Sequence, residues 1–267
     1  IEWKNLFNQN STGSYVNRSG KNFESNYNPN NHSFDQVYKY IYTSQLVGIQ
    51  SNKNKDLTLE WTLGYNRAGR TQPDYRRYRS DLDVATGQST LYVPFGAAQA
   101  FFLGRFSSDM TENTYSGNIN LTKQFGDVQV KIGSLYEDKT RDFDARNLGY
   151  VRSSSNDFDY TLIENSITNL FNSINKTGIK IDEQTNPSDS YKSNNKLAAA
   201  YVTTLIPINN KLAFNAGVRF ENNIQDLKSA LIGGEPINLN YPITKVLPSA
   251  NINYTFSSKT VLKSSYG

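Results

Sequence analysis

The dominant pattern along the chain is a strict alternation of apolar and polar residues. In the clearest run, Leu212, Phe214, Ala216, Val218 and Phe220 alternate with polar or small residues, and the segments 57–65, 128–132 and 252–256 repeat the pattern. A period of two places successive side chains on opposite faces of a β-strand. The pattern therefore predicts nine strands, at about 1–17, 34–50, 57–70, 106–125, 128–143, 191–208, 212–227, 245–256 and 260–267.

The connections between these runs are of two kinds. Four are short and polar, at 51–56, 126–127, 209–211 and 257–259, and predict tight hairpins. The links between the hairpins are much longer, and they run at roughly 18–33, 71–105, 144–190 and 228–244. In the third long link, the apolar residues of 160–174 predict a short amphipathic helix, with the loop packing on itself as the alternative.

Strand and loop length together favour a membrane barrel over a soluble sandwich. Sandwich strands are usually five or six residues long, with turns every 8–12 residues, and long structureless loops are uncommon in compact domains. Outer-membrane barrels combine tilted strands, short turns on one side and long loops on the other. The charges Glu60, Lys131, Glu137, Arg219 and Glu221 all fall on polar strand faces, where a barrel would use them to line a wet lumen or touch a plug. The predicted fold is all-β, part of an antiparallel transmembrane β-barrel.

Three segments resemble hairpins of the TonB-dependent outer-membrane receptors. They are Ala200-Tyr201 leading through a short turn into Gly217-Val-Arg-Phe-Glu221, then Leu247-Pro248-Ser249 with the turn at 257–259, and Glu112-Asn-Thr-Tyr-Ser-Gly117 running into Leu121 and Phe125. The resemblance implies a 22-stranded barrel with an N-terminal plug, a size at which the lumen is plugged. It also implies import of a scarce ligand, such as an iron chelate, a vitamin or an oligosaccharide, driven by TonB and the proton-motive force.

The resemblance carries expectations for organisation and partners. Because about nine strands are present, we expect residues 1–267 to be part of a single barrel domain, an internal piece of a larger protein without the plug or the closing strands. The implied partners are outer-membrane lipid, the TonB complex acting through the missing plug, and a small extracellular ligand. The implied location is the outer membrane of a Gram-negative bacterium. The family's best-defined functional motif has no matching position in this sequence.

Composition narrows the possible chemistry. The chain has no cysteine and a single histidine, His32, which lies in an Asn-rich stretch. Cysteine- or histidine-based metal sites, Cys–His nucleophiles and disulfide scaffolds are therefore excluded or nearly so, and a Ser-His-Asp triad would depend on His32 alone. No apolar run approaches the 18 residues of a transmembrane helix. The net charge of +4 is small for this length and implies no nucleic-acid partner. We expect no enzymatic activity, no cofactor and no metal.

The most suggestive cluster for ligand binding is Tyr75, Arg76, Arg77, Tyr78 and Arg79. Three guanidinium groups beside two phenols could bind a carboxylate or phosphate, because arginine offers a bidentate fork of donors. The same residues could instead bind anionic lipopolysaccharide near the membrane edge, or support the predicted 71–105 loop.

Three other groups of polar and aromatic residues can be interpreted without a specific binding site. Asp81 and Asp83 have the look of a calcium loop but lack a third carboxylate and a bidentate glutamate at the required spacing. The charged residues near the end of one strand predict a solvated charge mixture, namely Glu137, Asp138, Lys139, Arg141, Asp142, Asp144 and Arg146. The loop aromatics either stack on a sugar or aromatic chelate or pack within their loop; they are Tyr92, Phe95, Phe101 and Phe102.

Three functional alternatives remain beside a TonB-dependent receptor. A passive porin or structural barrel would need no plug. A soluble carbohydrate-binding β-sandwich would purify without detergent. An outer-membrane lipase or protease would need a nucleophile–base pair that the sequence does not display.

Overall fold

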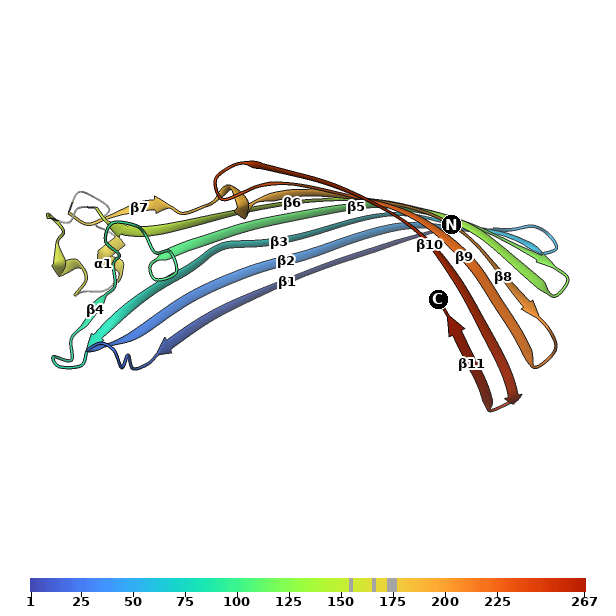
Figure 1. Cartoon of the computed structure of the whole chain (residues 1–267), viewed down its shortest axis with the longest axis horizontal. Coiled ribbons are helices and arrows are strands. Elements are labelled where there is room, and N and C mark those ends of the chain that lie inside the picture. The colour runs from blue at the N-terminus through green and yellow to red at the C-terminus, as the bar shows by residue number, and fades with distance from the viewer. Residues whose placement is uncertain (154–155, 165–166, 172–176) are drawn as a thin grey trace.

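A computed structural model describes residues 1–153, 156–164, 167–171 and 177–267, and its strands form one curved antiparallel sheet (Figure 1). The strands are β1 (Glu2–Ser19), β2 (Tyr27–Ser51), β3 (Leu57–Asp83), β4 (Ser89–Leu91), β5 (Gly104–Phe125), β6 (Val128–Arg152), β7 (Ile179–Glu183), β8 (Tyr191–Pro207), β9 (Leu212–Ala230), β10 (Pro236–Ser257) and β11 (Thr260–Tyr266). Three short helices lie in the loops: the 3₁₀ turns η1 (Tyr160–Leu162) and η2 (Pro187–Asp189), and the α-helix α1 (Ile167–Phe171). Among the described residues, no helix is long and apolar enough to cross a membrane.

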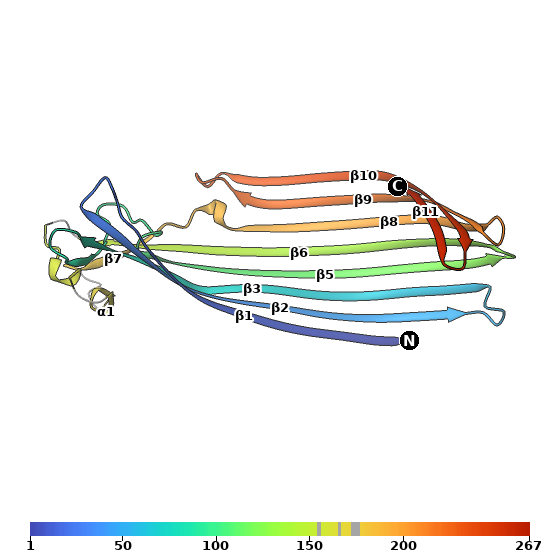
Figure 2. The same cartoon turned by 90° about the horizontal axis from the view of Figure 1, so that it is seen from below.

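The sheet is an up-and-down meander. Its order is β1-β2-β3-β5-β6-β8-β9-β10-β11, with the short β4 paired to β3 and β7 paired to β6. Within the described residues, β1 and β11 are the two edges and the sheet is open (Figure 2). Because all paired strands belong to this one sheet, the described chain has no second layer of the kind that a soluble β-sandwich requires.

All nine predicted strands are present, but several predicted loops are much shorter than expected. The segments 27–33, 71–83, 144–152 and 236–244 are strand rather than loop, and the expected long link at 228–244 is a turn at 231–235. In 27–33 and 71–83 the apolar alternation fades before the hydrogen-bonded ladder does, and backbone pairing to neighbouring strands maintains the extended conformation. In 236–244 the alternation continues at Ile237, Leu239, Tyr241 and Ile243, between prolines and asparagines that are typical of loops.

The four predicted hairpin turns lie together at one end of the sheet, on the right in Figure 1. One of them places Gly126 in the left-handed conformation with φ 58°, which suits a tight turn between β5 and β6. The connection 84–103 and the described parts of the connection 153–190 lie at the opposite end. The predicted separation of short turns from long loops is therefore confirmed.

One face of the sheet carries an apolar belt next to the short turns. Residues two apart on a strand share a face, and directly paired residues share it across strands. In this belt Trp61 covers the backbone of Gly48 on the neighbouring strand. The belt includes Leu57, Leu59, Trp61, Leu63 and Tyr65 on β3, and Leu212, Phe214, Ala216, Val218 and Phe220 on β9. Each run spans nine positions, which matches the 9–11 residues of a tilted membrane-crossing strand.

The belt ends abruptly on the side facing the long loops. A row of aromatic rings marks the limit, with Tyr65 5.1 Å from Tyr115 and 6.3 Å from Tyr42 between ring centroids. The next positions on the same face are charged or amide side chains: Arg67 on β3, Asp138 on β6, Lys196 on β8 and Asn222 on β9. An apolar band bounded by aromatics is the surface expected of a membrane barrel.

The opposite face, called the polar face here, carries the charges that the sequence placed there. Lys131 Nζ lies 3.5 Å from Glu60, and Arg219 Nε lies 2.6 Å from Glu221. Val218 and Phe220, which alternate with that second pair, are 41% and 48% exposed on the belt side. The predicted alternation is thus present, and which face meets lipid stays a prediction.

Candidate ligand-binding surface at the loop end of the sheet

The five-residue Tyr75–Arg79 cluster lies in β3 and not in a loop, which corrects the sequence prediction. A register irregularity between Gln72 and Tyr75 precedes it, after which Tyr75 pairs with Phe106 and Arg77 with Gly104. Strand alternation then divides the cluster between the two faces of the sheet. Tyr75, Arg77 and Arg79 share the polar face, whereas Arg76 and Tyr78 lie on the other. The three guanidinium groups therefore do not converge on one ligand.

Arg76 is held by a carboxylate. Its Nε donates to Asp74, whose other oxygen accepts a hydrogen bond of 2.7 Å from Arg105 Nε. Burial of Asp74 disfavours its charged form, but the hydrogen bonds from Arg105 and Arg76 outweigh burial and lower its pKa. These residues lie well beyond the apolar belt. The positive charge of Arg76 is therefore already paired with the carboxylate of Asp74.

Tyr78 belongs to an aromatic stack that also contains the only histidine. Its ring lies 4.5 Å from the ring of His32 at an interplanar angle of 11°. The hydroxyl of Tyr15 lies 2.7 Å from His32 Nδ1, and Phe34 packs beside both tyrosines. The histidine on which a catalytic triad would depend is thus part of an aromatic stack, with a tyrosine at Nδ1.

Arg79 forms an ion pair and two cation–π contacts on the polar face. It donates to both oxygens of Asp81, at 2.6 and 3.0 Å, and its guanidinium carbon lies 4.9 Å from the ring centres of Tyr92 and Phe102. Asp83 accepts hydrogen bonds from two backbone N–H groups of the following turn. The two aspartates of the suspected calcium loop therefore serve an ion pair and a turn. No cluster of three or more acidic or histidine side chains able to hold a metal occurs in the part of the chain that the structure describes.

Arg77 differs from its neighbours. Its guanidinium lies over the ring of Tyr75 at 5.0 Å, and its Nε is buried with no hydrogen-bond partner among the described residues. Burial lowers its pKa below the usual value. A half-buried cation without a carboxylate leaves a desolvation cost that an anion would offset. Of the three predicted arginines, Arg77 is the one without an acidic partner among the described residues, and a ligand-binding role for it stays a prediction.

The loop aromatics are partly packed and partly exposed. Phe102 contacts Tyr92 at 5.2 Å and Phe101 at 4.2 Å between ring centroids. Phe95 and Phe101, however, are 63% and 60% exposed. Tyr92 and Phe102 thus pack within the loop, as one of the two sequence interpretations expects. The exposed rings of Phe95 and Phe101 leave the other interpretation, stacking on a ligand, a prediction.

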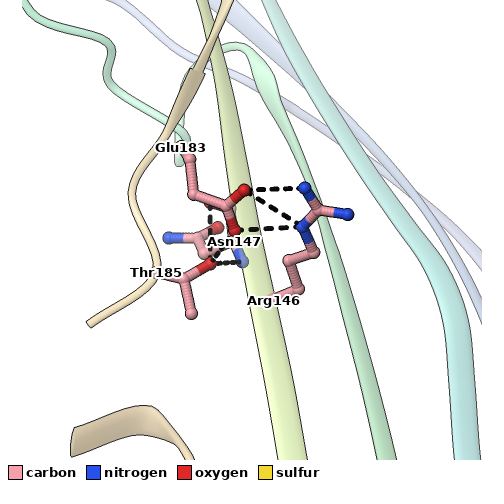
Figure 3. Close-up of polar contacts among 4 residues, drawn as sticks. All are labelled: Arg146, Asn147, Glu183 and Thr185. Carbon is pink, nitrogen blue, oxygen red and sulfur yellow. Dashed lines mark hydrogen bonds and ion pairs between the residues drawn. The ribbon is translucent and has the colours of Figure 1, made fainter. Parts of the chain in front are cut away.

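A set of hydrogen bonds and an ion pair joins β7 and the residues after it to β6, and the sequence did not predict it (Figure 3). These contacts are called the β6–β7 latch here. Arg146 donates to both oxygens of Glu183, and the hydroxyl of Thr185 donates to Glu183 at 2.6 Å. The backbone N–H of Asn147 donates to the same hydroxyl at 2.8 Å. The hydrogen bonds from Arg146 and Thr185 lower the pKa of Glu183 to about 2. Only the pairing of distant segments reveals this contact, because Glu183 and Arg146 are far apart in sequence.

Several other charges near this end of β6 form ion pairs, within the mixture of charges that the sequence predicted. Arg141 pairs with Glu112 on the polar face, and Lys192 lies 3.2 Å from Asp142. Lys139 lies 3.6 Å from Glu137.

The single amphipathic helix predicted at 160–174 is wrong. Two short helical turns, η1 and α1, replace it, with a turn at Ile163, and position 174 lies outside the described residues. Its apolar residues nevertheless pack as the pattern implied. Leu170 is fully buried, and Leu162, Ile163, Ile167 and Phe171 pack around the same small core.

Comparison with known families identifies the architecture. The model of the family described as TonB dependent receptor-like, beta-barrel matches residues 2–267. The chain belongs to this family. TonB-dependent receptors are transporters of the Gram-negative outer membrane and not enzymes.

Two solved TonB-dependent receptors resemble the chain at low sequence identity. The ferric citrate transporter FecA in its unliganded form shares 13% identity with a TM-score of 0.39, over 98% of this chain and 42% of that one. The ferric-catecholate import receptor Fiu from E. coli K12 shares 10% identity with a TM-score of 0.32, over 95% of this chain and 44% of that one. The chain thus spans less than half the length of either receptor. No curated protein sequence matches it.

Proposed function

We propose that residues 1–267 form part of the barrel of an active outer-membrane importer for a scarce ligand, such as an iron chelate, a vitamin or an oligosaccharide. The observation that carries the proposal is the family match over residues 2–267, and the nine-position apolar belt agrees with it. In this proposal the belt contacts outer-membrane lipid, and the long loops face the cell exterior. TonB acts through a plug domain that residues 1–267 do not supply.

Within that proposal, Tyr75 and Arg77 contact the ligand on the polar face. Support comes from the buried, unpartnered Nε of Arg77 among the described residues and from its cation–π contact with Tyr75. Arginine binds carboxylates and phosphates through two parallel hydrogen bonds, so the favoured ligand carries an anionic group. Arg76, Tyr78 and Arg79, which the sequence grouped with them, instead support the surrounding structure.

The experiment that tests the function is a growth assay with the full-length receptor in cells lacking their own copy. Ferric chelates, vitamins and oligosaccharides are supplied one at a time as the limiting nutrient, with and without functional TonB. Growth that needs both the receptor and TonB is the expected result. Growth that needs the receptor but not TonB would identify a passive porin instead, and growth that never needs the receptor would overturn import altogether.

A further inference from the structure

The segment 92–103, called the cap segment here, lies directly on the polar face of the sheet. Gly104 on β5 and Gly149 on β6 are paired opposite each other, on the face that carries Glu112 and Arg141. A Cβ atom at Gly149 would lie 2.5 Å from the Cβ of Ala98, and one at Gly104 would lie 2.4 Å from the carbonyl oxygen of Ala100. The two glycines therefore form a flat seat that no larger residue could provide without displacing the segment.

The cap segment is part of a small hydrophobic core built from both long loops. The core combines Val93 and Leu103 from the cap segment with residues from β4, β6, β7, α1 and the loop between them. Its buried members are Leu91, Val93, Leu103, Tyr150, Phe158, Leu170 and Ile179. Burial of large apolar side chains is the main favourable contribution to folding. This end of the sheet is therefore folded around a core of its own.

Two arginines fix the cap segment to the strands. The guanidinium of Arg79 packs against the contacting rings of Tyr92 and Phe102, near the two ends of the segment, and the backbone N–H of Tyr92 donates to the Arg79 carbonyl at 2.9 Å. Arg152 Nε donates to the carbonyl of Val93 at 3.2 Å, and its backbone N–H donates to the Pro94 carbonyl at 3.0 Å.

The second long loop is tied to the same points. The guanidinium of Arg152 also lies 4.9 Å from the ring of Phe158 and 5.1 Å from that of Tyr160. From β7, a carboxylate oxygen of Asp182 accepts the backbone N–H of Ala98 at 3.2 Å. The backbone of the cap segment is thus held from β3, β6 and β7 together.

We propose that the cap segment is a preformed constriction that stays seated on the polar face and narrows the entrance from the loop end of the sheet. Arg79 and Arg152 are its positioning residues, and Gly104 and Gly149 are its seat. The exposed rings of Phe95 and Phe101 are consequently held at fixed places beside that entrance. The role in ligand entry rests on the proposed function, whereas the seating of the segment does not.

The test uses single cysteines in the full-length receptor, with every other cysteine removed; residues 1–267 contain none. Ala98 is 5% exposed and Phe95 is 63% exposed, so a thiol reagent should label Ala98→Cys on intact cells at least about tenfold more slowly than Phe95→Cys, because only an opened segment exposes it. Adding Gly149→Val should raise the labelling rate of Ala98→Cys to that of Phe95→Cys. The matched control Gly20→Val, at a position with no atom within 4 Å of the added Cβ, should leave it slow.

Equal labelling of Ala98→Cys and Phe95→Cys in the unaltered background would overturn the proposal, as would slow labelling that Gly149→Val leaves unchanged. Where Gly149→Val does not reach the membrane, Arg79→Gln releases the clamp without filling the seat and should raise the labelling rate in the same way. None of these readouts involves a ligand. Protection of Ala98→Cys in a receptor that fails the growth assay would therefore leave the seated segment standing and remove only the proposed import.

Discussion

The hydroxyl of Tyr201 on β8 donates to Asn120 Oδ1 on β5 by reaching across Gly133 on the intervening β6. A Cβ atom at Gly133 would lie 2.4 Å from that amide oxygen and 2.5 Å from the Tyr201 ring carbon that bears the hydroxyl. The glycine thus permits a polar contact that spans three strands of the polar face.

Replacing this glycine should weaken the sheet. We expect Gly133→Val to lower the free energy of unfolding by about 1–2 kcal/mol, since it displaces both partners of a hydrogen bond of ordinary strength. The matched control is Gly117→Val on the belt side, where the added Cβ meets only Leu63, at 3.5 Å. Urea unfolding of the full receptor in detergent measures both, and equal losses would contradict the role given to Gly133.

The lipid-facing side of the sheet can be tested by moving one charge by one residue. Ala216 lies at the middle of the apolar belt on β9, and Asn215 lies on the opposite face. Ala216→Arg should cost about 2–4 kcal/mol of folding free energy in a bilayer, as arginine does at the lipid midplane, whereas Asn215→Arg should cost far less. The reverse order in unfolding titrations from vesicles would place lipid on the polar face.

Ligand capture should depend on Arg77 and not on Arg76. We expect Arg77→Gln to weaken binding of an anionic ligand found in the growth assay and to make binding less sensitive to salt, because the variant lacks a charge whose attraction for the anion salt partly screens. Arg76→Gln is the control, since its guanidinium is paired to Asp74 on the other face. Binding measured at low and high salt with unchanged affinity for Arg77→Gln would remove that residue from the site.

The orientation of the loops can be read from labelling on intact cells. Cysteine at exposed Ser89, beyond the end of β3, should react with an impermeant reagent, whereas cysteine at exposed Asn210, in the turn between β8 and β9, should react only after the outer membrane is permeabilised. The expectation rests on the long loops of outer-membrane barrels facing outward and the short turns facing the periplasm. The opposite pattern would invert the sheet in the membrane.

The β6–β7 latch should respond to acid in a defined window. The folded-state pKa of Glu183 is about 2, below its ordinary value of 4.5, so its stabilising effect is complete above pH 4.5 and is lost as the pH falls towards 2. The unfolding temperature of the wild type should therefore exceed that of Glu183→Gln near neutral pH, and the difference should shrink across this window. A difference that stays constant down to pH 2 would show that the latch does not couple to stability.

The sequence predicts the belt well because the two faces of a strand with one apolar and one polar environment require opposite kinds of side chain at alternate residues, as in the run from Leu212 to Phe220. In the strand ends beyond the belt, alternate residues no longer need to be apolar and polar. Segments such as 71–83 then lose their alternation, although their backbones remain paired, and the resulting error placed Tyr75–Arg79 in a loop and grouped residues that the strand separates. The Arg146–Glu183 pair and the seat at Gly104 and Gly149 depend on contacts between distant segments, which single-sequence patterns do not encode.

The strands continue far past the belt, and this has an electrostatic consequence. From Asn66 to Arg77, β3 extends for about 36 Å at 3.3 Å per residue. With the belt in a bilayer, a strand tilted by about 45° places Arg77 about 25 Å beyond the belt, which is about three times the 8 Å over which fields decay at physiological salt. A charged solute near the entrance therefore experiences the potential of the protein's own side chains, and changes in lipid charge should leave its rate of capture nearly unaltered.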